Sequence, residues 1–172
     1  MNEKQLFLDT AFKIADRIVK NAIWDDDKCT WKIYAPSMTN PKERTGKWEN
    51  AGGTVYQGTA GIALFLAEMF RITKDQKFVK TLRGAVNNSL NESQKLPLNS
   101  FGFYSGHVGI AYASVLSGKY LEDENFIKKG LETITPMLGK ELQDNGIDVI
   151  GGAGGAIQPL LKIYEITNDE CV

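Results

Sequence analysis

The sequence predicts an all-α fold, an α/α toroid or part of one, in which the inner and outer helices of successive hairpins alternate. One phrase occurs three times in the 172 residues: an apolar or aromatic residue, then Gly-x-x-Gly, then a small apolar run. Its first glycines, Gly58, Gly106 and Gly152, are roughly 47 residues apart, a period typical of stacked helical units. After each of the first two glycine pairs, a helix without a polar face precedes a one-faced helix. Flat solenoids usually have two one-faced helices per unit, which favours the toroid.

Length and composition are those of a single globular domain spanning 1–172. The chain is 42% hydrophobic and 24% charged, its formal net charge is −1, and its basic residues are scattered. We therefore expect no nucleic-acid partner and no membrane partner. Cys29 and Cys171 are isolated, and the N-terminus lacks the continuous apolar stretch of a signal peptide. Both features indicate a cytoplasmic protein.

The first element expected is an outer, amphipathic helix over 3–22. Its apolar residues recur at three- and four-residue spacing, and they are Phe7, Ala11, Ile14, Ile18 and Ala22. The lysines and the aspartate between them fall on the other faces, so the helix is expected to bury one face only.

A long loop is expected over 24–53, where the helical periodicity disappears. Only Cys29, Trp31 and Ile33 alternate with polar neighbours, as residues of a short strand do. The acidic run 25–27 lacks the glycine and the closing glutamate of a calcium loop, so we interpret it as solvated charge. Long connections in compact domains are often binding loops or lids.

Three helical hairpin repeats follow, beginning near residues 56, 104 and 150. In the first, the run 62–70 is apolar nearly all round and is expected to be an inner helix. Asp75 is expected to cap the outer helix after it. That helix has one apolar stripe, which consists of Phe78, Val79, Leu82, Val86 and Leu90.

The second repeat shows the same order. The run 108–116 is expected to be the inner helix, with Gly118 ending it and Asp123 opening a one-faced outer helix. Pro136 is expected to end or kink that outer helix. In the third repeat Pro159 fits only the first turn of the inner helix. The residues expected on that inner helix are Ala156, Ile157, Leu160, Leu161 and Tyr164.

The glycine pairs precede the inner helices. We expect them to let the backbone adopt positive φ and to let each helix start lie against a neighbour without an intervening Cβ. In a toroid these loops gather at one end, where helix N-termini offer free N–H groups to an anion, a carboxylate or a thiolate. The alternative is that each pair serves only helix contact.

Three segments carry a resemblance to a known family. Residues 53–67, 102–111 and 148–157, the last with its Asp-Val-Ile lead, resemble the first three repeats of the lanthionine synthetase C-like family. The resemblance covers most of the chain from about 52 to 164. It implies an α/α toroid around a zinc ion, which activates a peptide cysteine thiol for addition to a dehydrated serine or threonine. The product is a thioether ring.

The family's zinc ligands, two cysteines and a histidine, belong to later repeats that this sequence does not show. Cys29, Cys171 and His107 match none of those ligand motifs, and a zinc site needs three or four converging ligands. We therefore expect no metal in this chain, which resembles the N-terminal half of the enzyme, and we expect the chain alone to be inactive.

Four residues are candidates for the site. Asp148 matches the family's aspartate before the third glycine motif, which the resemblance implicates in proton transfer, and its alternative role is to cap the following turn. His107 lies inside the second motif, and Tyr56 and Tyr104 precede the first and second motifs. We interpret these three as possible substrate contacts, with loop support and gap filling as the alternatives.

Two other functions stay open. One is a non-catalytic toroid module that binds a peptide or a protein partner, and the other is a carbohydrate-active toroid enzyme. The second is less favoured because Asp148 has no evident second acid with which to pair. A three-hairpin arc also leaves apolar edges, so the chain alone is expected to form a homodimer through them or to aggregate.

Overall fold

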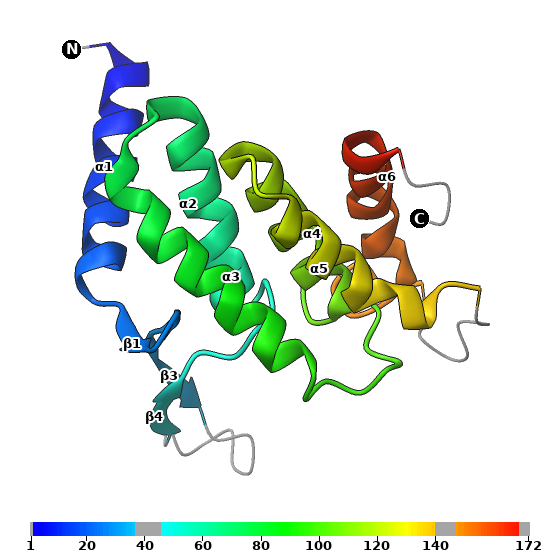
Figure 1. Ribbon diagram of the computed structural model, residues 1–172. Helices are drawn as coiled ribbons and strands as arrows, with labels where there is room; N and C mark the ends of the chain where they lie inside the picture. Colours follow the sequence, from blue (N-terminus) through cyan, green and yellow to red (C-terminus); the bar gives the residue numbers. More distant parts are fainter. Residues whose placement is uncertain (1, 37–45, 140–146, 169–172) are drawn as a thin grey trace.

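The computed structural model describes residues 2–36, 46–139 and 147–168, and within them the chain is a partial α/α toroid of two helical layers (Figure 1). Inner helices α2, α4 and α6 lie side by side, outer helices α3 and α5 cover them, and α1 packs against α2. The predicted fold class is confirmed. The bounds are α1 Glu3–Lys20, α2 Thr59–Thr73, α3 Val79–Ser93, α4 His107–Leu121, α5 Glu124–Ile134 and α6 Ile157–Thr167. No described helix combines the length and the apolar composition needed to cross a membrane.

Two small sheets occupy much of the segment that was expected to be a loop. Strand β1 (Ile23–Asp25) pairs antiparallel with β2 (Lys28–Thr30), and β3 (Lys32–Pro36) pairs antiparallel with β4 (Gly46–Asn50). The single strand expected across Cys29, Trp31 and Ile33 is therefore wrong, because the chain leaves one ladder at Trp31 before it joins the next. Tertiary contacts cause this break.

Trp31 connects the break between the two sheets to neighbouring parts of the chain. Its carbonyl accepts a hydrogen bond from the Ala51 N–H at 2.8 Å, and its indole N–H donates to the Ile18 carbonyl at 2.9 Å. The side chain is buried. Trp31 thus joins the strands both to α1 and to the chain that enters α2.

The buried stripe of α1 differs from the expected one. Ala15 is fully buried, and Ala11 and Ile18 pack against the same core, whereas Phe7 is 74% exposed and Ile14 is 50% exposed. The stripe that faces α2 therefore passes through Ala15 rather than Ile14. In Figure 1 the N-terminal turns of α1 project past the end of α2, which explains why an apolar residue there has no neighbour to cover it.

Short polar residues begin the outer helices as expected. The Asp75 carboxylate accepts from the Lys77 N–H at 3.0 Å and starts a 3₁₀ turn that leads into α3. The Asp123 carboxylate accepts from the Asn125 N–H at 3.1 Å and the Phe126 N–H at 3.3 Å at the start of α5. Helix α5 ends at Ile134, and Pro136 lies in the 3₁₀ turn that follows, as the sequence predicts.

Gly118 does not end α4, which continues to Leu121 and is closed by Glu122 in the left-handed conformation. The reason is the close approach of α5, because a Cβ on Gly118 would lie 2.8 Å from the Asp123 carbonyl oxygen and 2.8 Å from the Ile127 side chain. Gly118 therefore serves helix packing rather than helix termination.

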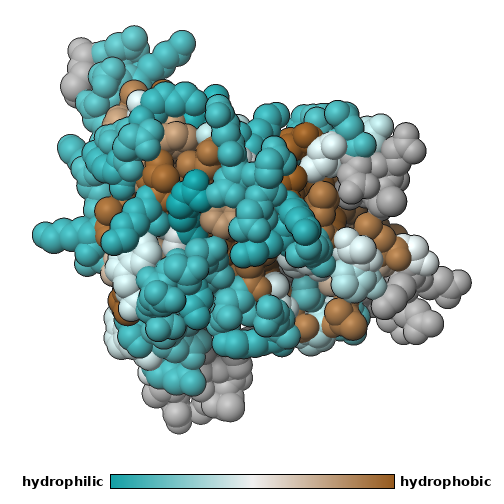
Figure 2. All heavy atoms as spheres, in the orientation of Figure 1, coloured by the Kyte–Doolittle hydropathy of each residue, from teal (hydrophilic) through white to brown (hydrophobic). Residues whose placement is uncertain are grey.

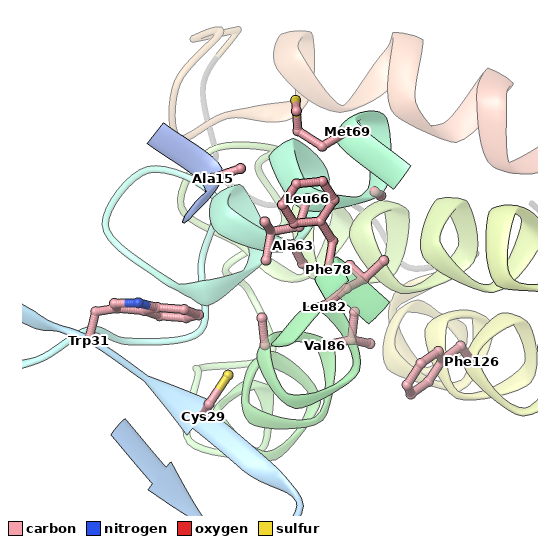
Figure 3. Close-up of a cluster of buried hydrophobic side chains, with 12 residues drawn as sticks. Ala15, Cys29, Trp31, Ala63, Leu66, Met69, Phe78, Leu82, Val86 and Phe126 are labelled. Atoms are coloured by element: carbon pink, nitrogen blue, oxygen red, sulfur yellow. The ribbon is translucent and has the colours of Figure 1, made fainter. Parts of the chain in front are cut away.

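The main core lies between α2 and α3 (Figure 3). Leu66, Phe78 and Leu82 are fully buried there, and Cys29 and Trp31 from the strands close the cluster on one side. Helix α2 is buried or half-buried along 62–70, as expected for a helix without a polar face. A second cluster joins α4 to α6 through Val108, Val115, Ala156 and Ile163.

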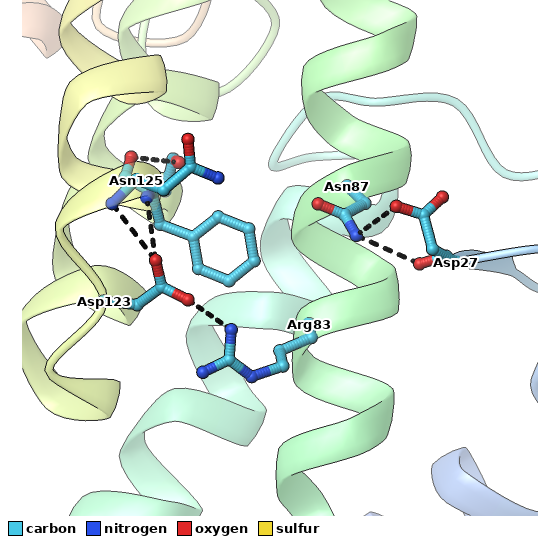
Figure 4. Close-up of polar contacts among 7 residues, drawn as sticks. Asp27, Arg83, Asn87, Asp123 and Asn125 are labelled. Atoms are coloured by element: carbon cyan, nitrogen blue, oxygen red, sulfur yellow. Dashed lines mark hydrogen bonds and ion pairs between the residues drawn. The ribbon is translucent and has the colours of Figure 1, made fainter.

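Polar contacts on the outer surface connect α3 to its neighbours (Figure 4). Arg83 forms an ion pair with Asp123, so the residue that caps α5 is also held by α3. The Asn87 amide donates to the Asp27 carbonyl at 3.1 Å and to its carboxylate at 3.0 Å. Asp27 is exposed, as expected of solvated charge, and it also accepts this contact from α3.

Helix α6 leaves part of its apolar surface exposed, as expected at the edge of a three-hairpin arc. Pro159, in its first turn, and Ile163 are buried, whereas Ile157, Leu161 and Tyr164 are 61%, 58% and 46% exposed. Apolar atoms gather on the side of the molecule where α4 and α6 lie (Figure 2). Within the described residues α6 packs along α4 on one side only. Self-association through this edge stays a prediction.

Candidate functional site

The glycine loops meet at one end of the arc. Gly58 and Gly106 are the N-cap residues of α2 and α4, and Gly152 precedes the 3₁₀ turn Ala153–Ala156 that leads into α6. The Tyr56 N–H donates to the Tyr104 carbonyl at 2.9 Å, which joins the first loop to the second. The second and third loops also touch.

The contact between the second and third loops is between backbones. A Cβ on Gly102 would lie 2.6 Å from the Gly151 carbonyl oxygen. Three loops that are far apart in sequence therefore form one surface at the inner-helix starts.

Close packing, not positive φ, explains the glycines. Gly58, Gly106 and Gly152 have φ values of −147°, −130° and −101°, so the expectation of positive φ is wrong. The second glycine of each motif follows one rule: a Cβ would overlap the carbonyl oxygen of the residue six positions earlier. The pairs are Gly61 with Val55, Gly109 with Phe103 and Gly155 with Val149.

The loop carbonyls also accept hydrogen bonds from the backbone amides at the helix starts. The Thr59 N–H donates to the Gly52 carbonyl at 2.9 Å, and the His107 N–H donates to the Ser100 carbonyl at 2.8 Å. Ala60 donates in the same way to Gly53 at 3.3 Å. The expectation that these N-termini present free N–H groups to an anion is therefore wrong for these three amides, because each loop bends back onto its own helix.

Tyr56 and Tyr104 are both at the surface of this region, with Tyr56 70% and Tyr104 37% exposed. Their backbones are joined, but only Tyr104 lines the neighbouring pocket. This pocket of about 260 Å³ lies between the second loop, the third loop and α6. Its lining includes Tyr104, Tyr112, Val149, Gln158 and Lys162. Aromatic walls with a few polar groups are typical of ligand pockets.

His107 is buried rather than presented at the surface of the loops. Its side chain is 4% exposed, and Nε2 lies 3.1 Å from the Pro97 carbonyl oxygen, to which it donates as Nε2–H. Nδ1 has no partner in the described part of the chain. Burial lowers the pKa of His107, so the ring is neutral. Substrate contact by His107 stays a prediction.

Asp148 lies where the second and third loops meet. Its exposed carboxylate accepts from the Gly151 N–H at 2.6 Å. A Cβ on Gly151 would lie 3.5 Å from that carboxylate and 3.6 Å from the Ser105 hydroxyl of the second loop. Hydrogen bonds from the Gly151 and Ile150 amides lower the pKa of Asp148. The capping contact is thus present, and proton transfer stays a prediction.

A polar group on the inner helices was missed. The Tyr120 hydroxyl of α4 donates to Glu68 of α2 at 2.9 Å, and Arg71 donates to the same carboxylate at 2.7 Å. Burial, followed by the Glu68 contact, raises the pKa of Tyr120 to about 12. Burial also raises the pKa of Tyr112. The only signal in the sequence was Glu68 inside an otherwise apolar run, which the apolar pattern outweighed.

The described residues do not fit a zinc site. No group of three or more histidine, cysteine or acidic side chains that could hold a metal occurs among the residues described. Cys29 is buried under α3, its thiol donates to the Thr81 carbonyl at 3.5 Å, and burial raises its pKa to about 12. Such a thiol resists the deprotonation that a metal ligand needs. Cys171 lies outside the described residues.

A family model described as lanthionine synthetase C-like protein matches residues 49–171. No curated protein matches the sequence.

The carbonyl contact at the second glycine generates a stability prediction. Gly109→Ala places a methyl group against the Phe103 carbonyl and 2.8 Å from the Val55 side chain, so we expect a loss of roughly 2–4 kcal/mol in the free energy of unfolding. Gly52→Ala is the matched control, because a Cβ there has nothing within 4 Å. Urea unfolding followed by circular dichroism measures both. Equal stability of the two variants would contradict the packing argument.

The buried histidine generates a pH prediction. His107 is the chain's one histidine, and its folded pKa is lowered, so the unfolded state takes up the proton first as pH falls. The contribution of neutral, buried His107 to the free energy of unfolding is fully present above about pH 6.5, the ordinary histidine pKa. It decreases between that pH and the lowered folded pKa.

The control for this titration is His107→Gln, which retains an N–H donor for the Pro97 carbonyl but cannot titrate. Its unfolding free energy should be flat between about pH 7 and pH 5, above the ordinary carboxyl range. Urea unfolding at several pH values gives both curves. A wild-type curve as flat as that of the variant would show that the histidine is not buried as described.

Proposed function

Because the chain belongs to the lanthionine synthetase C-like family over residues 49–171, we propose that it binds a peptide at its three glycine loops during thioether ring formation. The reaction adds a peptide cysteine thiol to a dehydrated serine or threonine. The observation that carries the proposal is the pocket beside the second and third loops. It lies where the inner helices start, and it combines aromatic walls with polar groups.

The pocket suits a peptide. Tyr104 and Tyr112 supply ring surface for an apolar side chain, and Phe103 packs edge-on to both rings with centroids 4.9 and 6.0 Å apart. Gln158 supplies hydrogen-bond donors for peptide carbonyl groups, and Lys162, whose Nζ donates to Glu165 at 2.6 Å, retains further N–H donors for the same purpose. A volume of about 260 Å³ suits a side chain or two rather than a whole folded partner.

Asp148 lies at the edge of this surface. Ring closure forms the bond between sulfur and the β-carbon, and the proton lost by the thiol is matched by one gained at the α-carbon. A carboxylate near the reacting residues can relay that proton. The amide hydrogen bonds that lower the pKa of Asp148 also weaken it as a base, so its support of the loop must be separated from the relay by experiment.

No step of the proposal uses a metal held by this chain. The described side chains that could bind zinc do not converge, and the Cys29 thiol is buried with a raised pKa. The chain's part in the reaction is therefore to hold and orient the peptide. Activation of the thiol is assigned to groups other than these residues.

Binding of a cysteine-containing peptide with one dehydroalanine tests the pocket. Lys162→Ala and Tyr104→Ala each remove a lining group and are expected to weaken binding about 5- to 20-fold, the cost of roughly one polar or aromatic contact. Tyr164→Ala is the control, because this exposed tyrosine of α6 does not line the pocket. Isothermal titration gives the three affinities. Equal affinities, or no binding by the unaltered chain, would refute the proposal.

Asp148→Asn separates the two roles of the carboxylate. The amide oxygen of asparagine still accepts from the Gly151 N–H, so we expect thermal stability and peptide affinity near those of the unaltered chain. In a preparation that forms thioether rings, the rate should fall about 10²-fold, the usual contribution of a positioned acid or base. Mass spectrometry after thiol alkylation measures ring formation. A lower melting temperature with an unchanged rate would assign Asp148 to structure alone.

A further inference from the structure

A second concave surface lies at the α1 edge of the arc, between α1 and the small sheets. It is a groove of about 620 Å³ lined by Ile14, Arg17, Ile23, Trp31, Lys32 and Trp48, among others. It shares no residue with the pocket beside the glycine loops. Figure 1 shows α1 and the strands at one edge of the molecule and α6 at the opposite edge, so the two surfaces are separate.

The groove exposes large apolar side chains. Trp48 is 67% exposed, Ile14 is 50% exposed and Ile23 is 42% exposed, and all three line it. Tryptophan contributes most where it enters an interface, since it provides a large contact area with few rotatable bonds. A concave apolar surface of this kind is typical of a recognition site.

The shape of the groove is held by contacts within the chain. Trp31 forms part of its wall, and its indole N–H donates to the Ile18 carbonyl of α1 at 2.9 Å. The Thr30 hydroxyl donates to the Ala51 carbonyl at 3.0 Å, and Trp48 packs edge-on against Tyr34 with ring centroids 5.7 Å apart. A preformed groove binds with a smaller entropic cost than one that must be ordered by its ligand.

The charge of the groove is positive. Arg17 and Lys32 line it, and neither forms an ion pair with any residue that the structure describes. Two acidic residues that are adjacent in sequence to residues of the groove form ion pairs with other lysines. Asp16 pairs with Lys77 at 2.9 Å, and Glu49 pairs with Lys47 at 3.3 Å. Among the described residues, no acidic side chain lines the groove. Electrostatic complementarity therefore favours a partner that carries carboxylates.

We propose that this groove docks an extended peptide segment in which apolar side chains alternate with acidic ones. The apolar side chains would cover Ile14, Ile23 and Trp48, and the carboxylates would pair with Arg17 and Lys32. A membrane surface fits less well, because polybasic lipid recognition uses clusters of four to eight cations, whereas two of the described residues that line this groove are cationic. This inference does not rest on the proposed function.

The test uses a capped hexapeptide in which leucine or phenylalanine alternates with aspartate. Its binding is followed by the indole N–H resonances of the three tryptophans. Trp48 should shift strongly and Trp31 weakly, whereas Trp24, which does not line the groove and packs under Lys80, should not shift. The expected dissociation constant is about 10 μM to 1 mM, as for a short peptide that covers little area.

Variants distinguish charge-specific docking from non-specific apolar binding. Arg17→Glu combined with Lys32→Glu should weaken binding at least about 10-fold, an effect of roughly 1.4 kcal/mol. Lys20→Glu, the same change at an exposed position of α1 that does not line the groove, should leave it unchanged. A peptide with asparagine in place of aspartate should bind about as weakly as the double variant does.

Three results would overturn the proposal. One is no shift of the Trp48 resonance at 1 mM peptide, and another is equal binding of the aspartate and asparagine peptides. The third is a Trp48 resonance that responds to phosphatidylserine vesicles and not to the peptide, which would identify the partner as a lipid surface.

Discussion

The arrangement of the loops depends on one steric constraint: a backbone carbonyl oxygen packs directly against the second glycine of each motif. At Gly61, Gly109 and Gly155 a carbonyl oxygen from the preceding loop occupies the space that any Cβ would need. Each loop can therefore lie flat on the start of its own inner helix, and in the first two loops the carbonyls accept hydrogen bonds from the first helical amides. Only loops held this closely can touch one another, as the first and second do through the Tyr56 amide and the Tyr104 carbonyl.

This constraint limits how the surface formed by the three glycine loops can bind a ligand. Since the carbonyls at the helix starts already satisfy the amides of Thr59, Ala60 and His107, recognition there falls to side chains rather than to helix dipoles with free N–H groups. Tyr104 and Lys162 are the side chains placed to act, and Asp148 stands beside them with its carboxylate held by the third loop. In the proposed function, the family provides the chemical context and the pocket is the surface assigned to the peptide.

The outer surface of the chain is organised differently. Salt bridges and caps such as Arg83 with Asp123 fix the outer helices, while Trp31 fixes the small sheets to α1. This second anchoring creates a groove in which Trp48, Arg17 and Lys32 lie outside the buried core. The α6 edge of the arc thus offers a pocket with polar donors, and the α1 edge offers an apolar groove whose described cations form no ion pair.

The repeat, the alternation of buried and half-exposed helices, and the caps at Asp75 and Asp123 followed from the sequence alone. These features depend on local periodicity and on short-range hydrogen bonds, which neighbouring residues determine. The break at Trp31, the exposure of Phe7 and Ile14, the continuation of α4 through Gly118 and the burial of His107 were decided only by tertiary structure. Each depends on which element lies opposite: α1 and the strands meet at Trp31, α5 presses on Gly118, and the Pro97 carbonyl holds His107. Contacts between residues distant in the chain are not encoded in any local pattern, so the glycine spacing predicted where the loops would gather but not that their amides would already be occupied.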